Sequence, residues 1–124
     1  MITEDYCSYE VAKLLEEKGF NEPIRCWYDS AKDFHERGVE MRNSDCISPT
    51  IMCPTHQMAM KWLREVHNLH IGIVRGPKGY HITIETIPLG VVKYITKEIV
   101  GTTYVDSYEE AVEAALKYSL ENLI

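Results

Sequence analysis

Residues 46–71 read CISPTIMCPTHQMAMKWLREVHNLHI, and this stretch decides which class of fold the chain adopts. Pro49 and Pro54 predict an extended or looped segment over 47–54, because a residue that precedes proline is pushed away from the α region. From about 56 to 67, apolar side chains then recur at helical spacing. They form one broad face: Ala59, Trp62, Leu63, Val66 and Leu69. The stretch therefore predicts a packed helix over about 56–67.

A second helix is predicted near the N-terminus, over about 9–18. Ser8 precedes its apolar stripe, and the serine hydroxyl can accept a hydrogen bond from an otherwise unpaired N–H of the first turn. Gly19 follows as the left-handed residue after the last turn, and Phe20 is placed to fold back on that turn. Both ends of this helix are thus predicted from the sequence.

The third helix is predicted at the other end, over about 107–122. Ser107 and Glu110 have the spacing of a capping box, in which two first-turn N–H groups are satisfied reciprocally. An apolar face follows at helical spacing. With the central helix, this gives three predicted helices.

Between these helices the hydrophobic period changes to two, which is typical of strands. The Gly/Pro turn RGPKG joins segments 70–75 and 79–87 into a predicted hairpin, and a second hairpin is expected from 24–28 to 38–42. Segment 91–105, VVKYITKEIVGTTYV, predicts one or two further strands interrupted by a glycine. The expected fold is α+β, with a mixed or antiparallel sheet of four to five strands built from hairpins. We expect a single domain over residues 1–124.

Length and composition agree with an ordinary globular domain that needs neither disulfides nor metal to fold. The chain has 124 residues, 45% of them hydrophobic, and a formal net charge of −6. No apolar run approaches the roughly 18–20 residues that cross a bilayer, so no membrane association is expected. The acidic start MITEDYCSYE lacks the features of a signal peptide, and a cytoplasmic protein is expected.

Two cysteines and a histidine, Cys46, Cys53 and His56, come nearest to a metal-ligand set. A structural zinc site usually shows two short-spaced ligand pairs, and only Cys53 and His56 form such a pair here. A cysteine-dependent enzyme centred on the same pair is a second reading, since a thiol near a helix N-terminus has a lowered pKa. No catalytic motif accompanies it. We expect no metal, no cofactor and no enzymatic activity. We interpret the three residues as side chains in and around a helix whose role is to fill the core.

Aromatic and basic side chains interleave through the middle of the chain. Residues 24–97 carry ten Lys or Arg against seven acidic residues, whereas both ends are acidic. Aromatic rings beside basic groups can bind a single nucleic-acid strand, although a pI near 5.3 disfavours this alternative. The same residues can equally form a protein-binding surface. The candidates are Trp27, Tyr28, Arg42, Lys61, Arg64, Arg75 and Tyr80.

Three phrases of the sequence resemble a set of small proteins encoded by phages, prophages and related mobile elements of gut bacteria. They are EVAKLLEEKGFNEPIRCWYDS, PTHQMAMKWLREVHNLHI and SYEEAVEAALKYSLENLI, and together they span nearly the whole chain. The resemblance implies a cytoplasmic accessory protein that forms a small oligomer, and it brings no known activity, ligand or catalytic residue. The expected function is therefore binding to an unidentified protein partner or to a second copy, a homodimer in the simplest case.

Overall fold

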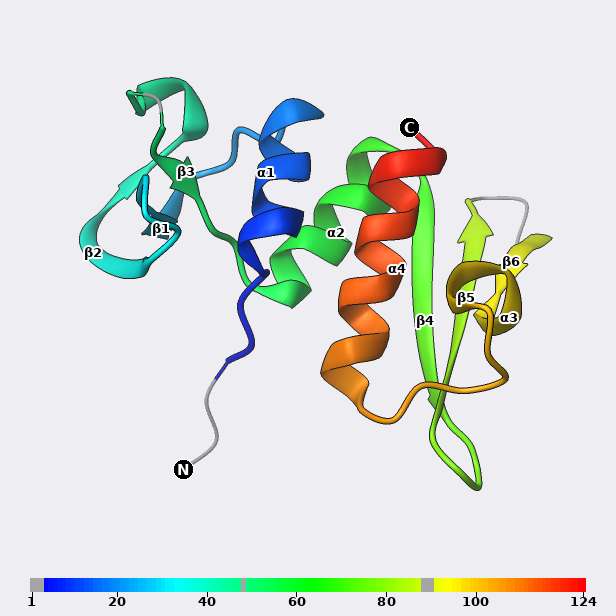
Figure 1. Ribbon diagram of the computed structural model, residues 1–124. Helices are drawn as coiled ribbons and strands as arrows, with labels where there is room; N and C mark the ends of the chain where they lie inside the picture. Colours follow the sequence, from blue (N-terminus) through cyan, green and yellow to red (C-terminus); the bar gives the residue numbers. More distant parts are fainter. Residues whose placement is uncertain (1–3, 48, 88–90) are drawn as a thin grey trace. The chain divides into compact units, whose positions relative to one another are not determined.

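The computed structural model describes residues 4–47, 49–87 and 91–124. The chain divides into two compact units, Met1–His56 (unit 1) and Gln57–Ile124 (unit 2). Each unit contains a three-stranded antiparallel sheet (Figure 1). The predicted α+β class is confirmed, with the strands divided between two sheets instead of joined in one. The single domain expected over residues 1–124 stays a prediction.

The sheet of unit 1 consists of a hairpin of two strands and a third strand of only two residues. The order is α1 (Tyr9–Glu17), β1 (Ile24–Tyr28), β2 (Phe34–Met41), the 3-10 helix η1 (Asn43–Asp45) and β3 (Ile51–Met52). β1 lies in the centre, between β2 and β3. The second strand of the hairpin begins at Phe34 and not near residue 38, because the connection closes early, with the Asp29 N–H donating to the Asp33 carbonyl at 3.1 Å. A bulge between Ile24 and Cys26 shifts the register at the other end of the hairpin.

Helix α1 begins and ends as the sequence predicts. The Ser8 hydroxyl accepts a hydrogen bond from the Val11 N–H at 3.2 Å. Gly19 adopts the left-handed conformation with φ +94°, and the Phe20 N–H then donates to the Leu15 carbonyl at 2.9 Å. The Phe20 and Leu15 side chains are both buried, as expected when the residue after a left-handed cap folds back on the last turn.

A short pairing closes unit 1 between segments distant in the sequence. Residues 5–7 run antiparallel to residues 54–56. Two backbone hydrogen bonds hold the pairing, from the Cys7 N–H to the Pro54 carbonyl (3.0 Å) and from the His56 N–H to the Asp5 carbonyl (2.9 Å). The chain before α1 is therefore fixed beside the chain that leads into the next helix.

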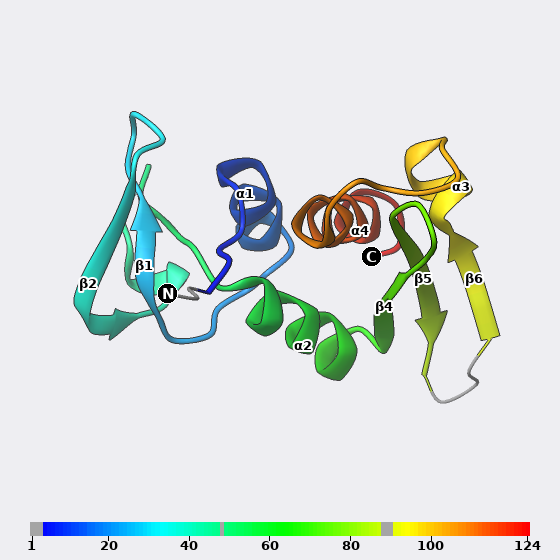
Figure 2. The same cartoon turned by 90° about the horizontal axis from the view of Figure 1, so that it is seen from below.

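Unit 2 builds its sheet from consecutive strands. The elements from residue 56 onward are α2 (His56–Val66), β4 (Leu69–Arg75), β5 (Tyr80–Thr86), β6 (Val91–Ile95), α3 (Thr96–Val100) and α4 (Tyr108–Asn122). The strand order is β4-β5-β6. Helix α4 packs against β4 and β5, and Figure 2 shows α3 on the same side of this sheet as α4. Among the described helices, none is both long enough and apolar enough to cross a membrane.

The core of unit 2 lies between this sheet and α4. Ile82 and Ile84 of β5 are fully buried. Their side chains share a sheet face with Tyr80, because alternate residues of a strand point the same way. The Tyr80 ring meets the Tyr108 ring of α4 edge-on, with the ring centroids 5.9 Å apart. Apolar residues of α4 are buried opposite: Ala111, Val112, Ala115, Leu116 and Leu120.

Helix α3 is not predicted by the sequence, which indicates strands throughout 91–105. β6 ends at Ile95, and the chain turns away as a five-residue helix capped by the left-handed Gly101. The buried Thr96 side chain then occupies the place of a strand partner. Its Oγ1 accepts a hydrogen bond from the Ile82 N–H at 2.8 Å. The ladder therefore continues through a side chain, which a period-two pattern does not reveal.

Replacing Thr96 with valine should expose the Ile82 amide to hydrogen exchange. Valine keeps the shape of threonine but removes the acceptor, and a buried N–H left without a partner costs about 1–3 kcal/mol. We expect exchange at Ile82 about tenfold faster, measured by amide hydrogen exchange at residue resolution. Thr103→Val, at an exposed threonine, is the matched control. Unchanged protection in Thr96→Val would contradict this role of the hydroxyl.

Candidate functional site

The three residues that come nearest to a metal-ligand set do not come together. Cys46 is half-buried after η1, and its Sγ donates to the Arg42 carbonyl at 3.5 Å. Cys53 is fully buried, and its Sγ lies 3.2 Å from the Cys7 carbonyl oxygen. In the described ranges, Cys46, Cys53 and His56 do not form a group whose ligand atoms lie within 4.8 Å of one another.

The pairing of residues 5–7 with 54–56 instead brings Cys7 beside His56. The Cys7 Sγ and a ring nitrogen of His56 lie within 4.8 Å of each other, and both side chains are buried. No signal in the sequence points to this neighbour, because the two residues meet through a contact between distant segments.

The basic candidates, apart from Arg42, belong to unit 2. Lys61 is exposed and Arg64 half-buried on α2. The Arg75 guanidinium lies 5.1 Å from the centroid of the Tyr80 ring. Because Tyr80 also packs against Tyr108 of α4, it belongs to the core side of the sheet and not to an open aromatic face.

Unit 1 gathers four aromatic rings at the turn end of its hairpin. We call Tyr6, Tyr9, Tyr28 and Phe34 the aromatic tip. Tyr28 lies at its centre, 5.6 Å from the Tyr9 ring and 5.7 Å from the Phe34 ring, while Tyr6 and Phe34 lie 5.0 Å apart. Phe34 is 39% exposed and the three tyrosines are half-buried. The Tyr28 hydroxyl donates to the Cys7 carbonyl at 2.7 Å, which fixes the central ring.

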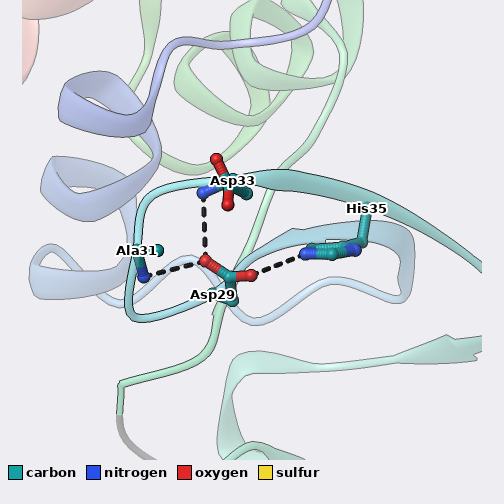
Figure 3. A network of polar contacts seen from close by, with 4 residues as sticks. All are labelled: Asp29, Ala31, Asp33 and His35. Carbon is teal, nitrogen blue, oxygen red and sulfur yellow. Dashed lines mark hydrogen bonds and ion pairs between the residues drawn. The ribbon is translucent and has the colours of Figure 1, made fainter.

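Asp29 holds the turn that precedes Phe34, and Figure 3 shows the polar contacts of its carboxylate. Its Oδ1 accepts hydrogen bonds from the N–H groups of Ala31 (2.8 Å) and Asp33 (3.0 Å). Its Oδ2 lies 2.7 Å from the His35 Nε2. An aspartate that binds the backbone two residues ahead is a common way to fix a turn. The Asp29 carboxylate thus holds the connection between β1 and β2 together with two backbone hydrogen bonds of the turn.

On the other face of the hairpin, the His35 ring stacks on Trp27. The two ring centroids lie 4.4 Å apart with 20° between the planes. Trp27 and Tyr28 are neighbours in β1 and therefore point to opposite faces of the sheet. The sequence marks both as aromatic surface candidates, but it shows neither that Tyr6, Tyr9 and Phe34 join Tyr28 nor that His35 stacks on Trp27.

Two carboxylates act on Tyr6, one of the four rings of the aromatic tip. A hydrogen bond with the Cys26 side chain, then partial burial and the charges of Glu36 and Glu4, raise the pKa of Tyr6 to about 12. Tyr6 is therefore neutral at physiological pH. The pKa of Cys26 is also raised, chiefly by burial, so its thiol stays protonated.

The stability of unit 1 should depend on pH through Asp29. Its pKa lies below the ordinary value, because the His35 side chain and then the Asp33 N–H hydrogen-bond to the charged carboxylate. A group with a lowered folded pKa stabilises the fold above its unfolded pKa of about 3.9, and this contribution is lost as the pH falls through the folded value. We expect the melting-temperature difference between wild type and Asp29→Asn to be full above about pH 5 and to shrink in acid.

His35→Gln provides the matched test, because it removes the largest cause of the lowered pKa. In that background the pH-dependent part of the Asp29→Asn difference should be much smaller. A difference that keeps the same size down to strongly acidic pH would contradict the assignment.

Comparison of the chain with protein-family models, with curated proteins and with solved structures gives no match.

Proposed function

We propose that this protein is a non-enzymatic accessory protein of the phage or prophage type, acting in the cytoplasm by binding another protein through its aromatic tip. The observation that carries the proposal is Phe34, an aromatic side chain 39% exposed and flanked by Tyr6 and Tyr28. Aromatic rings are enriched where proteins bind one another and contribute much of the binding energy. The resemblance to small mobile-element proteins supports an accessory role.

The turn contributes to this function by holding the rings in place before a partner arrives. Asp29 fixes the connection that precedes Phe34 through two backbone hydrogen bonds and one contact with His35. Little conformational freedom is then lost on binding, and this loss is a main cost of association. An exposed ring on a fixed turn is suited to contact with another macromolecule.

The other two readings find less support in the same geometry. Proteins bind single nucleic-acid strands where aromatic rings lie along a basic groove. Beside Tyr6 of the aromatic tip, the nearby charges are instead the carboxylates of Glu36 and Glu4. A cysteine-dependent enzyme requires a thiol that substrate can reach, and Cys53 is fully buried. Binding to a protein is the reading that the rings and their surroundings favour.

Self-association is a second form of the proposal. β4 pairs with β5 along one edge, and no described strand pairs with its other edge. Edge strands are ready templates for pairing with a second chain, so a homodimer would extend this sheet across a two-fold axis. Light scattering at micromolar concentration should then give the mass of a dimer. A monomer at all concentrations would exclude self-association and would leave binding to a different protein as the proposed function.

Truncating Phe34 should remove most of the binding. A random peptide library selected on the intact chain supplies the ligands, and Phe34→Ala is expected to weaken the tightest of them about 30-fold. Val39→Ala, at a side chain 71% exposed on the same strand, is the control and should change affinity less than about twofold. An amide NMR spectrum of each variant checks the fold. Selected peptides that bind Phe34→Ala as tightly as wild type would refute the proposal.

A further inference from the structure

We propose that the aromatic tip recognises an arginine-rich segment of its protein partner, whose guanidinium groups stack on the ring faces and pair with the neighbouring carboxylates. This inference rests on the proposed function and names the chemistry of the partner. It follows from the charges around the rings and from a cation that the chain itself places on one of them.

The first support is the sign of the charge around the tip. Glu36 is exposed two residues beyond Phe34 on β2, so both side chains point to the same face of the sheet. Asp33 is exposed next to Phe34 in the chain, and Glu4 is exposed two residues before Tyr6. Across Met1–His56 there are eleven acidic residues against six basic ones. An anionic partner would be repelled from this unit, whereas a cationic one would be attracted.

The second support is Lys32, which shows that a ring of this tip accepts a cation. Its Nζ lies 5.1 Å from the centroid of the Tyr9 ring. Lys32 has φ +65°, a left-handed conformation uncommon outside glycine, and its N–H donates to the Asp29 carbonyl at 2.9 Å. The fixed turn thus aims a cation at one ring, while the more exposed Phe34 ring lies beside Tyr28 in the same cluster.

Arginine fits this surface better than lysine. A planar guanidinium stacks on aromatic faces and forms paired hydrogen bonds with a carboxylate, while an ammonium group is a compact and strongly hydrated charge. Phe34 offers a partly exposed aromatic side chain, and Glu36 offers an exposed carboxylate on the same side of the strand. The two contacts together specify charge and shape, which neither gives alone.

The test compares peptides that differ in charge but hardly in shape. The first is a short Ser/Gly peptide with arginine at every third position, and the second carries citrulline, the neutral isostere of arginine, at the same positions. A third carries glutamate. Each is titrated into the intact, isotopically labelled chain and followed by NMR. We expect the arginine peptide to bind at least about tenfold tighter than the citrulline peptide, to shift the amides around Phe34 and to weaken with salt.

Variants separate recognition at the tip from general attraction to an acidic surface. Glu36→Gln and Phe34→Ala should each weaken the arginine peptide several-fold, while Glu17→Gln, at an exposed acid of α1, should leave it unchanged. No binding of the arginine peptide at low salt, or equal weakening by Glu17→Gln, overturns the inference.

The outcomes also distinguish this inference from the proposed function. If arginine and citrulline peptides bind equally and both lose affinity in Phe34→Ala, the tip binds proteins but does not require a cation, and only the inference fails. If library-selected peptides are also insensitive to Phe34→Ala, the proposed function fails with it.

Discussion

A maleimide added to the folded protein is expected to modify Cys46 rapidly and the other three thiols only when the structure opens. Cys7, Cys26 and Cys53 are buried, with exposed fractions of 0%, 6% and 0%, whereas Cys46 is half-buried near the surface. A buried thiol reacts only through local or global opening, which lowers its rate by about a hundredfold or more when opening costs about 3 kcal/mol or more. Mass spectrometry of time points should therefore show one fast adduct.

Cys46→Ser supplies the control for this assignment. The fast adduct should disappear in the variant, and all four wild-type thiols should react in denaturant. Cys26 should be slow for a second reason, since burial raises its pKa and lowers the fraction of reactive thiolate. Rapid modification of Cys53 in the folded protein would contradict its burial and would revive the reading of a cysteine-dependent enzyme.

Phe20→Ala should be the most damaging single truncation in unit 1. The side chain is 1% exposed, and it directly follows Gly19, the left-handed residue that ends α1. Its removal therefore leaves a cavity and loosens the end of this helix. A buried Phe→Ala substitution costs about 3–5 kcal/mol, of the same order as the whole stability of a small unit. Native-state amide exchange in β1 reports the free energy of opening of unit 1 separately from unit 2.

Phe34→Ala is the matched control, because it makes the same substitution at the other phenylalanine of the chain. Phe34 is 39% exposed, so we expect a loss of less than about 1 kcal/mol. Equal losses at the two positions would mean that Phe34 is part of the core, and they would remove the basis for assigning it to a binding surface.

The helix boundaries could be predicted because their causes are local. Ser8 and Ser107 accept the hydrogen bonds expected of N-caps, from Val11 and from Glu110, each at 3.2 Å. Gly19 has the positive φ that its place after a helix implies. The hairpin of β4 and β5 also forms as predicted, because a Gly/Pro turn sets its register within a short stretch.

The other features could not be predicted because their causes are not local. Whether strands join one sheet or two depends on packing between distant segments, and β3 is too short to show a period. α3 consists largely of residues that also suit a strand, and only the hydroxyl of Thr96 shows why β6 ends there. Within the aromatic tip, Tyr28 could be singled out because it lies among the interleaved aromatic and basic residues of the middle of the chain. Tyr6 and Phe34 come together only when the hairpin folds.

The pairing of residues 5–7 with 54–56 also delays the closing of unit 1 during synthesis. Cys7 contacts Thr55, 48 positions further along, so unit 1 cannot close until both segments have left the ribosome. The hairpin of β4 and β5 joins neighbouring residues and can form within microseconds of its emergence. A nascent chain therefore keeps unit 1 open until Thr55 has emerged, and until then the residues around Tyr6 lack this closing contact.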